Sequence, residues 1–503
     1  MSRYRLLRPL FRTFLLGLQP LLSLAQSPQG LPGEVTGAAL DGPPYQRVIV
    51  DPERDLETTL DGEFSLAAVG DVVAIRPTAN LAVPEVQAIY DVLRGADVAF
   101  GNLEMTIADP ANVALYNDAH MFQALGRPLI ADDLSLIGFD LMNFANNHTT
   151  HYSLTGMLET MQHMERVGIV TAGWGRNLAE ARSAKFLDTP NGRIGFLGIT
   201  TNSFWDARPA GEDSPGAPGA NALHPQRIVT ISRESFDALR YAHASSPHMF
   251  PGLYPISSAR SFGDEGDRIR LYNELYVPGG KPGYSYVIPP AELESYAREI
   301  RDAKYLSDFV VANIHSHHWQ IPPDARSAGD ESRDPPDFLM ELARTAIDNG
   351  ADAFFSHGEG ELRGVEIYNG KPIFYQLGNF NRHPFFQEIF NPEYWERAER
   401  NRGVDTENLT CAQVQALIYP TNHDREYFES VVTVSHYNEG VLEEIRLYPV
   451  DLKFDGPFVD IGTPHLASGE VAQRVLQTLR DASAAFGTEI RISDDVGIVE
   501  IGR

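Results

Sequence analysis

Polar side chains stand at the ends of six apolar, strand-like runs of this sequence, and their types are those that bind metals or move protons. Carboxylates, carboxamides and imidazoles offer oxygen and nitrogen ligands to divalent ions. The clearest run is Phe139–His148, which stops in two amides and an imidazole. The complete set is Asp71; Asn102 and Glu104; Asn146, Asn147 and His148; His315, His317 and His318; His357; and Gln376 and Asn379.

These strand ends predict one shared site. A lone histidine after a strand is more often structural, and a lone Asn-Asn pair is more often a turn. The joint occurrence is harder to explain in that way, because open α/β sheets bind ligands outside the carboxyl ends of their strands. Such a site would hold one or two divalent metals, which lower the pKa of water from ~15.7 to ~7 on zinc. A spare imidazole could then protonate a leaving oxygen.

The composition excludes several kinds of site and partner. With 68 acidic and 41 basic residues, the chain of 503 residues has a formal charge of -27. Nucleic-acid binding needs a basic surface, so we exclude nucleic acid as a partner. Cys411 is the single cysteine, which excludes an intrachain disulfide and a thiolate zinc cluster. Any metal must use His, Asp, Glu and Asn, and these suit Mn, Zn or Fe.

The N-terminus has the pattern of a secretory signal. Arginines precede the short apolar stretch Phe14–Ala25, and Ser23 and Ala25 are small residues suited to cleavage before Gln26. The stretch is too short to span a bilayer comfortably, and no later segment has the pattern of a transmembrane helix. The alternative is an amphipathic or disordered N-terminus. We expect residues 1–25 to direct export, and the protein to be periplasmic or secreted.

Strand-like and helical patterns alternate along most of the chain, which predicts an α/β layered sheet. Residues 26–62 are rich in Pro, Gly and Asp and predict a linker or small β appendage with one strand at Arg47–Val50. We expect one domain over residues 63–503, with a hairpin at 428–436 and 440–450. Helical spacing predicts helices at 85–94, 127–137, 153–167, 178–185, 291–304, 336–348 and 469–485.

The alternation stops at residues 203–290, which are rich in Pro, Gly, Ser and aromatic residues. A structureless loop of this length is uncommon unless it is functional or inserted. We interpret the segment as an insertion. It could be a lid over the site, and a variable surface excursion is an equal alternative.

Taken in order, the motifs resemble those of the CapA family of capsule or poly-γ-glutamate biosynthesis proteins, which is related to the calcineurin-like metallophosphoesterases. The resemblance covers roughly residues 64–500, interrupted by the insertion. It is specific because several motifs occur together. They are Gly70-Asp71 with Arg76, Asn102-Leu-Glu104, Ala145-Asn-Asn-His148, the His315 cluster, and His357-Gly followed by the run Gly364–Phe380.

The resemblance implies a fold and a set of roles. The fold is a four-layer α/β/β/α metallophosphatase-like sandwich with a long insertion. The cofactor is one or two divalent ions, and His148 corresponds to a catalytic acid or phosphate contact. The implied metal ligands are Asp71, Glu104, Asn147, His315 and His357. Further polar residues of the same motifs are expected to contact the substrate, and these are Arg76, Asn102, Asn146, His317, His318, Glu359 and Asn379.

One motif departs from the family pattern. The family continues with His-Gly-Pro-His in the late motif, whereas this chain has His357-Gly-Glu-Gly-Glu361. The second histidine position is therefore Gly360. Glu359, Glu361, His317 or His318 could supply the missing ligand.

Two functions remain open from the sequence. The first is an exported metal-dependent hydrolase of a phosphoester or of an amide in a polyglutamate-like polymer, in which His148 assists attack by activated water. The second is a non-catalytic protein that binds or guides an acidic polymer, together with envelope polymer-synthesis machinery. The missing histidine favours the second. The charge of -27 counts against it, unless metals or a local basic cluster offset that charge, and the candidates are Arg76, Arg363, Lys371 and Arg382.

Overall fold

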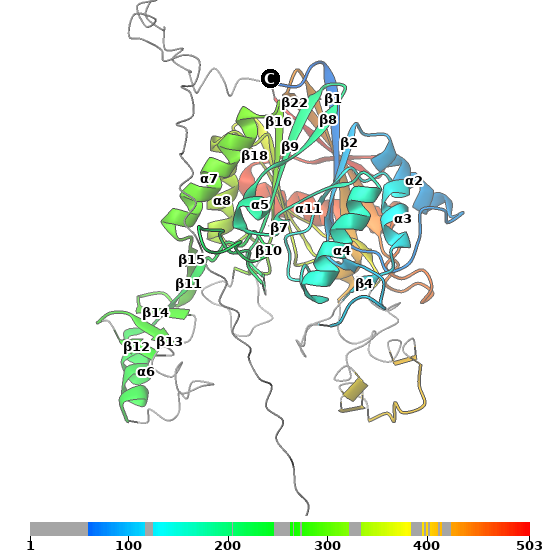
Figure 1. Ribbon diagram of the computed structural model, residues 1–503. Helices are drawn as coiled ribbons and strands as arrows, with labels where there is room; N and C mark the ends of the chain where they lie inside the picture. The colour runs from blue at the N-terminus through cyan, green and yellow to red at the C-terminus, as the bar shows by residue number, and fades with distance from the viewer. Residues whose placement is uncertain are drawn as a thin grey trace, which may run out of the picture. The chain divides into compact units, whose positions relative to one another are not determined.

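The computed structural model describes most of the chain from residue 59 to residue 502 (Figure 1). The predicted signal peptide at 1–25, the strand at 47–50 and Cys411 lie outside the described residues. No helix in the described part has the length and hydropathy needed to cross a membrane. The described ranges are 59–115, 124–203, 205–245, 262–264, 266–271, 274–320, 333–383, 395–396, 399–400, 403–410, 413–414 and 424–502.

Two large sheets form the centre of the described residues. In the larger, ten-stranded sheet, β1, β2, β5 and β6 are parallel, whereas β21 pairs with β1 in the antiparallel sense. Its main path is β24 (Arg491–Ser493), β25 (Val496–Glu500), β22 (Val441–Asp451), β21 (Glu429–Asn438), β1 (Glu63–Val73), β2 (Val98–Leu103), β5 (Leu141–Asn143) and β6 (Val170–Ala172), with β20 (Asn379–Arg382) beside β1 and β23 (His465–Leu466) beside β22.

The second sheet has six strands, and its central strands β9, β16, β17 and β19 are parallel. Because both sheets have a parallel centre, each brings several carboxyl ends to a single edge. The path is β18 (Leu362–Tyr368), β19 (Lys371–Leu377), β17 (Ala353–His357), β16 (Phe309–His315), β9 (Gly192–Thr200) and β8 (Lys185–Thr189).

Alternating side chains join the two sheets through a shared apolar core. In β1, Leu66 and Ala68 belong to this core, while Ala67 and Val69 face the opposite side. Successive side chains of a strand point to opposite faces. Phe100 of β2 packs against Phe196 and Phe355 of the second sheet, with ring centroids 5.6 and 5.1 Å apart. This buried contact fixes the two sheets against each other directly beneath the predicted site, since Phe100 also lies 6.3 Å from the ring of His357.

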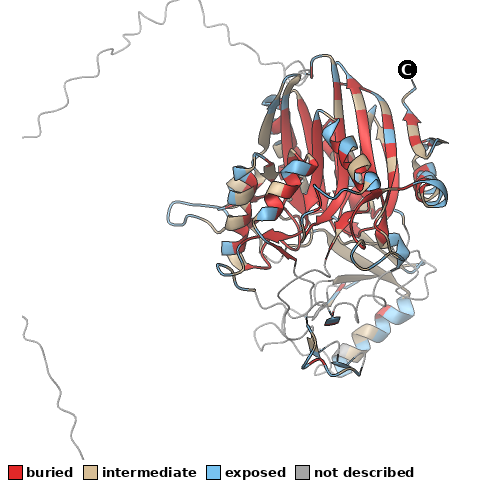
Figure 2. Cartoon of the chain, turned by 90° about the vertical axis from the view of Figure 1, so that its right-hand side faces the viewer, coloured by how far each residue is buried: buried red, intermediate tan, exposed pale blue. Residues whose placement is uncertain are grey.

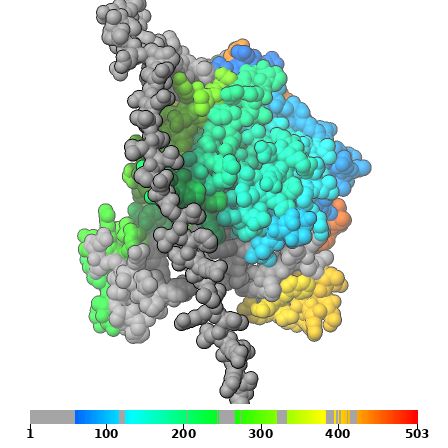
Figure 3. Space-filling model, in the orientation of Figure 1, coloured from blue at the N-terminus to red at the C-terminus, as the bar shows by residue number. Residues whose placement is uncertain are grey.

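Helices pack on the outer face of each sheet (Figure 1). Figure 2 shows that the strands are largely buried, whereas the helices expose one side. Figure 3 shows α3 and α4, in cyan, within the surface that faces the viewer. The helices on the larger sheet are α2 (Pro84–Arg94), α3 (Leu129–Ile137) and α4 (Ser153–Arg166); those on the second sheet are α7 (Pro290–Tyr305) and α8 (Asp337–Asp348); and α11 (Gly469–Ser483) contacts β18 and β22.

The predicted α/β class is confirmed, and most predicted helices match within a few residues. The predicted hairpin is confirmed as β21 and β22. The predicted helix at 178–185 is wrong in its second part. Helix α5 (Leu178–Arg182) ends early, and Lys185 begins β8, which pairs with β9 as a hairpin. The helix cannot continue to Lys185 because Ser183 has an extended backbone conformation, which ends the helix. Strand β18 was not predicted, although it pairs along its length with β19.

The described parts of the insertion at 203–290 contain regular structure. Strand β10 (Gly219–Ala220) pairs with β7 (Trp174–Gly175). Tyr286 packs on Phe338 of α8, with ring centroids 5.3 Å apart, so the inserted sheet contacts the second large sheet through α8. Five further strands form a separate sheet with α6 (Arg233–Ser245) beside it, and they are β11 (Gln226–Ile231), β12 (Phe262–Asp264), β13 (Ile269–Leu271), β14 (Glu274–Pro278) and β15 (Gly283–Val287).

Candidate metal centre

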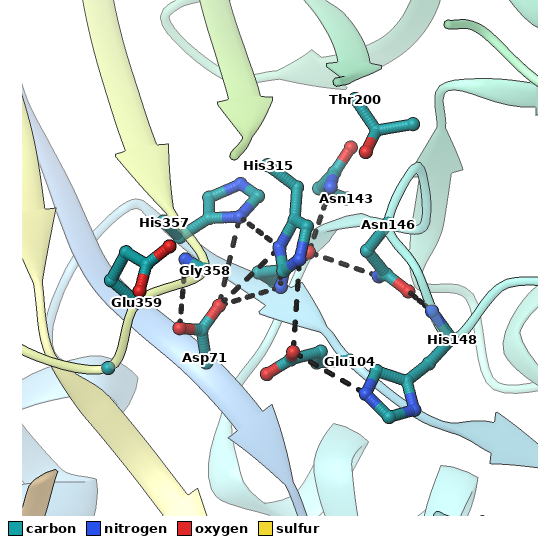
Figure 4. A network of polar contacts seen from close by, with 12 residues as sticks. Asp71, Glu104, Asn143, Asn146, His148, Thr200, His315, His357, Gly358 and Glu359 are labelled. Carbon is teal, nitrogen blue, oxygen red and sulfur yellow. Dashed lines mark hydrogen bonds and ion pairs between the residues drawn. The ribbon is translucent and has the colours of Figure 1, made fainter. Parts of the chain in front are cut away.

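The strand register brings the predicted polar residues into two rows. In the larger sheet Asp71 of β1 is aligned with Asn102 of β2, and Asn102 is aligned with Asn143 of β5. In the second sheet His315 of β16 is aligned with His357 of β17 and with Thr200 of β9. The two rows meet because both parallel strand groups end at the same edge of the core (Figure 4). The structure therefore brings the polar residues of successive strand ends together.

Asp71, His315 and His357 form a first ligand group. The Nδ1 atoms of His315 and His357 lie 3.2 Å apart. Oδ1 of Asp71 lies 3.9 Å from the first and 3.8 Å from the second. All three side chains are at most 1% exposed, and the three atoms lie close enough together to hold one cation.

Glu104, His315 and His317 form a second, overlapping group. Here His315 contributes its other nitrogen, and Nε2 lies 3.1 Å from Nε2 of His317 and 3.8 Å from Oε1 of Glu104. Two further residues border this group. Nε2 of His148 lies 3.6 Å from Oε1 of Glu104, and Oε1 of Glu359 lies 3.4 Å from Nδ1 of His317.

A network of carboxamide side chains orients Asp71 through hydrogen bonds. Nδ2 of Asn102 donates to Oδ1 of Asp71 at 2.8 Å. Oδ1 of Asn102 accepts from Asn143 at 2.8 Å and from Asn146 at 3.3 Å. The other carboxylate oxygen of Asp71 accepts the backbone N–H of Gly358 at 3.0 Å. Gly358 has a φ of 129°, which favours glycine, so this donor depends on the residue type.

Burial sets the protonation of the two acids. Burial raises the pKa of Asp71 to about 6, although hydrogen bonds from Asn102 and Gly358 oppose the shift. Burial also raises the pKa of Glu104 well above its usual range, and the charge of Asp71 adds to this. The guanidinium of Arg382 lowers both pKa values, but less than burial raises them. The positive charge near Asp71 and Glu104 is therefore too small to keep both carboxyl groups ionised. A bound cation would favour their ionised forms.

The same burial keeps the imidazoles neutral. Burial, with neighbouring histidines, lowers the pKa of His148 and of His315 well below the usual value. It lowers the pKa of His357 to about 3. Neutral imidazole is the form that ligates metals. Neutral imidazoles form no ion pair with Asp71 and Glu104. The rings and the two carboxyl groups together are instead suited to bind a divalent cation.

Asn147 adds a further oxygen with the properties of a ligand. The residue is 3% exposed, and its Oδ1 has no hydrogen-bond partner among the described residues. A buried carbonyl oxygen without a partner costs about 1–3 kcal/mol. A cation would remove that cost. The donor set therefore fits a divalent metal ion.

Three of the predicted substrate contacts bond to residues that belong to neither ligand group. His318 packs between Tyr286 and Phe338, and its Nδ1 meets the hydroxyls of Thr201 and Ser316. Arg76 donates to Val459 and Thr463. Asn379 donates to the carbonyls of Gly360 and Tyr427. The motifs placed these residues near the strand ends, but their contacts are with other parts of the fold, which for His318 include Tyr286 of β15 and Phe338 of α8.

Several site residues were not singled out from the sequence. His151 lies edge-on to His148, with ring centroids 4.5 Å apart. Oδ1 of Asn313 lies 3.1 Å from Nε2 of His357, and Asn143 anchors Asn102. A polar residue inside an otherwise apolar strand is the sequence signal that could have identified Asn143 and Asn313.

Gly360 leaves little room for the histidine of the family pattern. Its φ is 71°, and a Cβ atom there would lie 2.5 Å from Nδ2 of Asn379 and 3.1 Å from the ring of Tyr427. Both contacts are closer than a real Cβ tolerates without movement of its neighbours. The side chains of Asn379 and Tyr427 therefore occupy the space that a histidine at position 360 would need.

Comparison with known proteins agrees with the motifs. The family model for the bacterial capsule synthesis protein PGA_cap matches residues 65–383. The chain belongs to the PGA_cap family. The match runs from β1 to the end of β20 and contains both ligand groups. Strands β21 and β22 follow the match, yet they complete the larger sheet beside β1.

Individual relatives support this membership in the PGA_cap family. The proteins y4sH and y4uA of Sinorhizobium fredii (strain NBRC 101917 / NGR234), both described as uncharacterized, are each 35% identical over 88% of this chain and 94% of their own length. The PGA biosynthesis protein CapA of Bacillus subtilis (strain 168) is 23% identical over 65% of each chain. The capsule biosynthesis protein CapA of Bacillus anthracis is 23% identical over 48% of this chain and 40% of its own length.

Proposed function

We propose that this member of the PGA_cap family is a metal-dependent hydrolase that cleaves a phosphoester or an amide bond in an anionic envelope polymer. The observation that carries the proposal is the convergence of Asp71, His315 and His357 at buried strand ends, with Glu104 and His148 beside them. Buried acids and neutral imidazoles are costly to keep together without a cation. Perturbed pKa values of this kind cluster at functional sites.

We also propose that the layers correspond to the α/β/β/α sandwich of metallophosphatases. Three apolar cores support this assignment. One lies between the sheets, and one lies under the helices on each outer face. The two rows of site residues belong to different sheets, so the site depends on both inner layers.

The residues divide the chemical work between them. A divalent cation held by the first ligand group would activate water and neutralise developing negative charge. Asp71 is oriented by Asn102 and Gly358, so its two oxygens are fixed before a cation binds. His148 is buried and lies 3.6 Å from Glu104. This pair can hold a proton next to the cation and deliver it to a leaving group.

The proposed substrate is anionic, and one basic residue near the site supports this. The guanidinium of Arg382 lowers the pKa values of both Asp71 and Glu104, so its positive charge acts at the site. The proposed location, periplasmic or secreted, rests on the N-terminal pattern and on the capsule functions named for the relatives.

A second function is favoured by one observation. The crowded environment of Gly360 excludes the second late histidine without rearrangement, and a scaffold that has lost a ligand could bind an acidic polymer without cleaving it. Such a protein would act with polymer-synthesis machinery. It would bind polymer with or without metal.

The experiment that tests the proposal loads the purified protein with Mn²⁺, Zn²⁺ or Fe²⁺ and measures hydrolysis. The probes are bis-p-nitrophenyl phosphate and a γ-linked glutamate oligomer. We expect turnover with metal. His148→Gln should reduce kcat about 10²- to 10⁴-fold, which is the range for loss of a general acid. His163→Gln, on the outer helix α4, is the matched control and should retain activity.

One combination of results would contradict the proposed hydrolase activity. Protein that binds a cation, retains its fold and binds the oligomer, but cleaves neither probe with any of the three metals, would support the polymer-binding alternative instead. Equal activity of His148→Gln and the unmodified protein would remove His148 from the mechanism.

A further inference from the structure

The orientation of the amide side chains assigns the proton on three imidazoles of the site, those of His357, His315 and His317. Nδ2 of Asn313 donates to the backbone carbonyl of Leu197 at 2.6 Å, and a carbonyl only accepts. Oδ1 of Asn313 is therefore the atom that faces Nε2 of His357 at 3.1 Å. Because an amide oxygen only accepts, Nε2 of His357 carries the proton. Nδ1 of the neutral ring then presents a lone pair to Asp71 and His315.

The amide of Asn102 fixes the proton of His315 in a similar way. Asn146 is fixed, because its Nδ2 donates to the carbonyl of Leu103 at 2.8 Å and its Oδ1 accepts the N–H of His148 at 2.9 Å. Its Nδ2 also points to one end of the Asn102 amide, which must be the oxygen. Nδ2 of Asn102 consequently faces Asp71 at 2.8 Å and Nδ1 of His315 at 3.2 Å.

The proton of His315 therefore lies on the far side of the ring. Nδ1 accepts from Asn102, so in the neutral ring Nε2 is the N–H. That N–H points to Nε2 of His317 at 3.1 Å. The nitrogen of His317 that receives it must be a lone pair, which leaves the proton of His317 on Nδ1, 3.4 Å from the carboxylate of Glu359.

These assignments separate the two overlapping ligand groups. The first group presents two lone pairs on Nδ1 atoms 3.2 Å apart, together with Oδ1 of Asp71. Lone pairs that face one another need a cation between them. The second group presents an N–H from His315, so it lacks one of its three ligand atoms. A neutral imidazole cannot give a lone pair to both groups.

We propose that this protein holds a single divalent cation between Asp71, Nδ1 of His315 and Nδ1 of His357, and that His317 and Glu359 are positioning residues that keep the His315 proton on Nε2. The inference rests on the proposed metal-dependent function. It goes further in assigning the stoichiometry, the ligating atoms and the role of Glu359, which stands beside the departure at Gly360. Binding would replace the longer contact from Asn102 to His315, while the 2.8 Å bond to Asp71 remains.

The inference predicts a definite tautomer for each ring, which nitrogen NMR reports directly. In metal-free protein labelled with ¹⁵N-histidine, His315 and His357 should be Nε2–H tautomers and His317 should be the Nδ1–H tautomer. His315→Gln, His317→Gln and His357→Gln assign the signals. Titration with Zn²⁺ should shift Nδ1 of His315 and His357 and leave His317 as an Nδ1–H ring.

Metal analysis and calorimetry measure the stoichiometry with the same ion. We expect one Zn²⁺ for each full-length chain. His357→Gln should abolish binding in the measurable range, whereas His317→Gln should retain one ion with an affinity about 10- to 100-fold lower, as for loss of a residue that orients a ligand. Glu359→Gln keeps an acceptor and should preserve the His317 tautomer. Glu359→Leu should not.

Several outcomes would overturn the inference. They are two Zn²⁺ ions per chain, an Nδ1–H tautomer for His315 or His357, or complete loss of binding in His317→Gln with its fold retained by circular dichroism. The proposed hydrolase fails separately. One bound ion with the expected tautomers but no hydrolysis would sink the activity alone, while hydrolysis with two bound ions would sink this inference alone.

Discussion

Two histidines of this protein each lie between two carboxylates, yet they have opposite charge states. His315 lies 3.9 Å from Asp71 and 3.8 Å from Glu104, and its pKa is far below the usual value because it is buried. His224 lies 3.1 Å from Asp206 and 3.2 Å from Glu292. Its hydrogen bond with Asp206 raises the pKa of His224 to about 9.

The difference shows that neighbouring residue types do not determine the role of a histidine. The side chain of His224 is 57% exposed, so water stabilises the charged ring and the two contacts add to that. His315 is 0% exposed. The pKa of its neighbour Glu104 is raised, so this carboxyl group gives the ring little negative charge to pair with. Desolvation therefore prevails at His315 and leaves a neutral ring. At His224 the ion pairs prevail, and they join the segment after β9 to α7.

The largest expected effect separates the two histidines by metal binding. His315→Gln should lower the affinity for Zn²⁺ by more than about 100-fold, because it removes a ligand rather than a residue that orients one. His224→Gln should leave metal content unchanged. Calorimetry with both variants measures the difference, and equal losses would show that the comparison is wrong.

A histidine introduced at Gly360 tests whether the buried region has room for another imidazole. Gly360→His should destabilise the fold by roughly 2–4 kcal/mol, because the backbone is left-handed and the Cβ meets Asn379 and Tyr427. Gly360→Ala should show most of this loss. Gly370→Ala is the matched control, since its φ is 73° but nothing lies within 4 Å, and it should cost about 1 kcal/mol. Chemical denaturation measures all three; a stable Gly360→His protein that binds a second ion would contradict the argument.

Neutralising an acid in each region should change stability in opposite directions. The folded pKa of Asp71 is about 6, above the ordinary value of 3.8. The ionised acid therefore reduces stability as pH rises from about 4 to above 6, and the full loss is present at pH 7. Asp71→Asn should stabilise the metal-free protein at pH 7 by roughly 1–2 kcal/mol, and less at pH 4.

Asp206→Asn is the counterpart, because the pKa of Asp206 is lowered by its hydrogen bond with His224. That variant should lower the melting temperature at pH 7. Thermal unfolding of the metal-free proteins at the two pH values decides the matter. Destabilisation by Asp71→Asn at pH 7 would show that its hydrogen bonds outweigh the cost of burying its charge.

The smallest expected effect is the pH dependence at His224. Its folded pKa of about 9 exceeds the ordinary value of 6.5, so its contribution is fully present below about pH 6.5 and is lost as pH rises through 9. Because the ring is more than half exposed, the contribution is roughly 0.5–1 kcal/mol after screening by solvent. Denaturation of the unmodified protein and His224→Gln at pH 6 and pH 10 measures it, and a difference that does not shrink at pH 10 would contradict the assignment.

The site could be predicted from the sequence to the extent that it depends on strand ends. Asp71, Asn102, His315 and His357 follow apolar runs, and parallel strands bring such positions to one edge. His318 follows the same run as His315, yet it packs with Tyr286 from the insertion. The residues around His318 in the sequence give no sign of this contact with β15. Strand β18 escaped prediction for a similar reason, since its pairing with β19 supplies the hydrogen bonds that its own sequence does not signal.

The sequence by itself determined the α/β class, the family motifs and the types of ligand atom, because these follow from local patterns and residue chemistry. Only the tertiary structure decided which atom of each residue faces the site. Leu197 and Leu103, which are remote from His357 and His315 in the chain, fix the amides that assign the imidazole protons. Burial, which is a property of the packed sheets, then keeps the ring of His315 neutral, while the more exposed His224 stays charged.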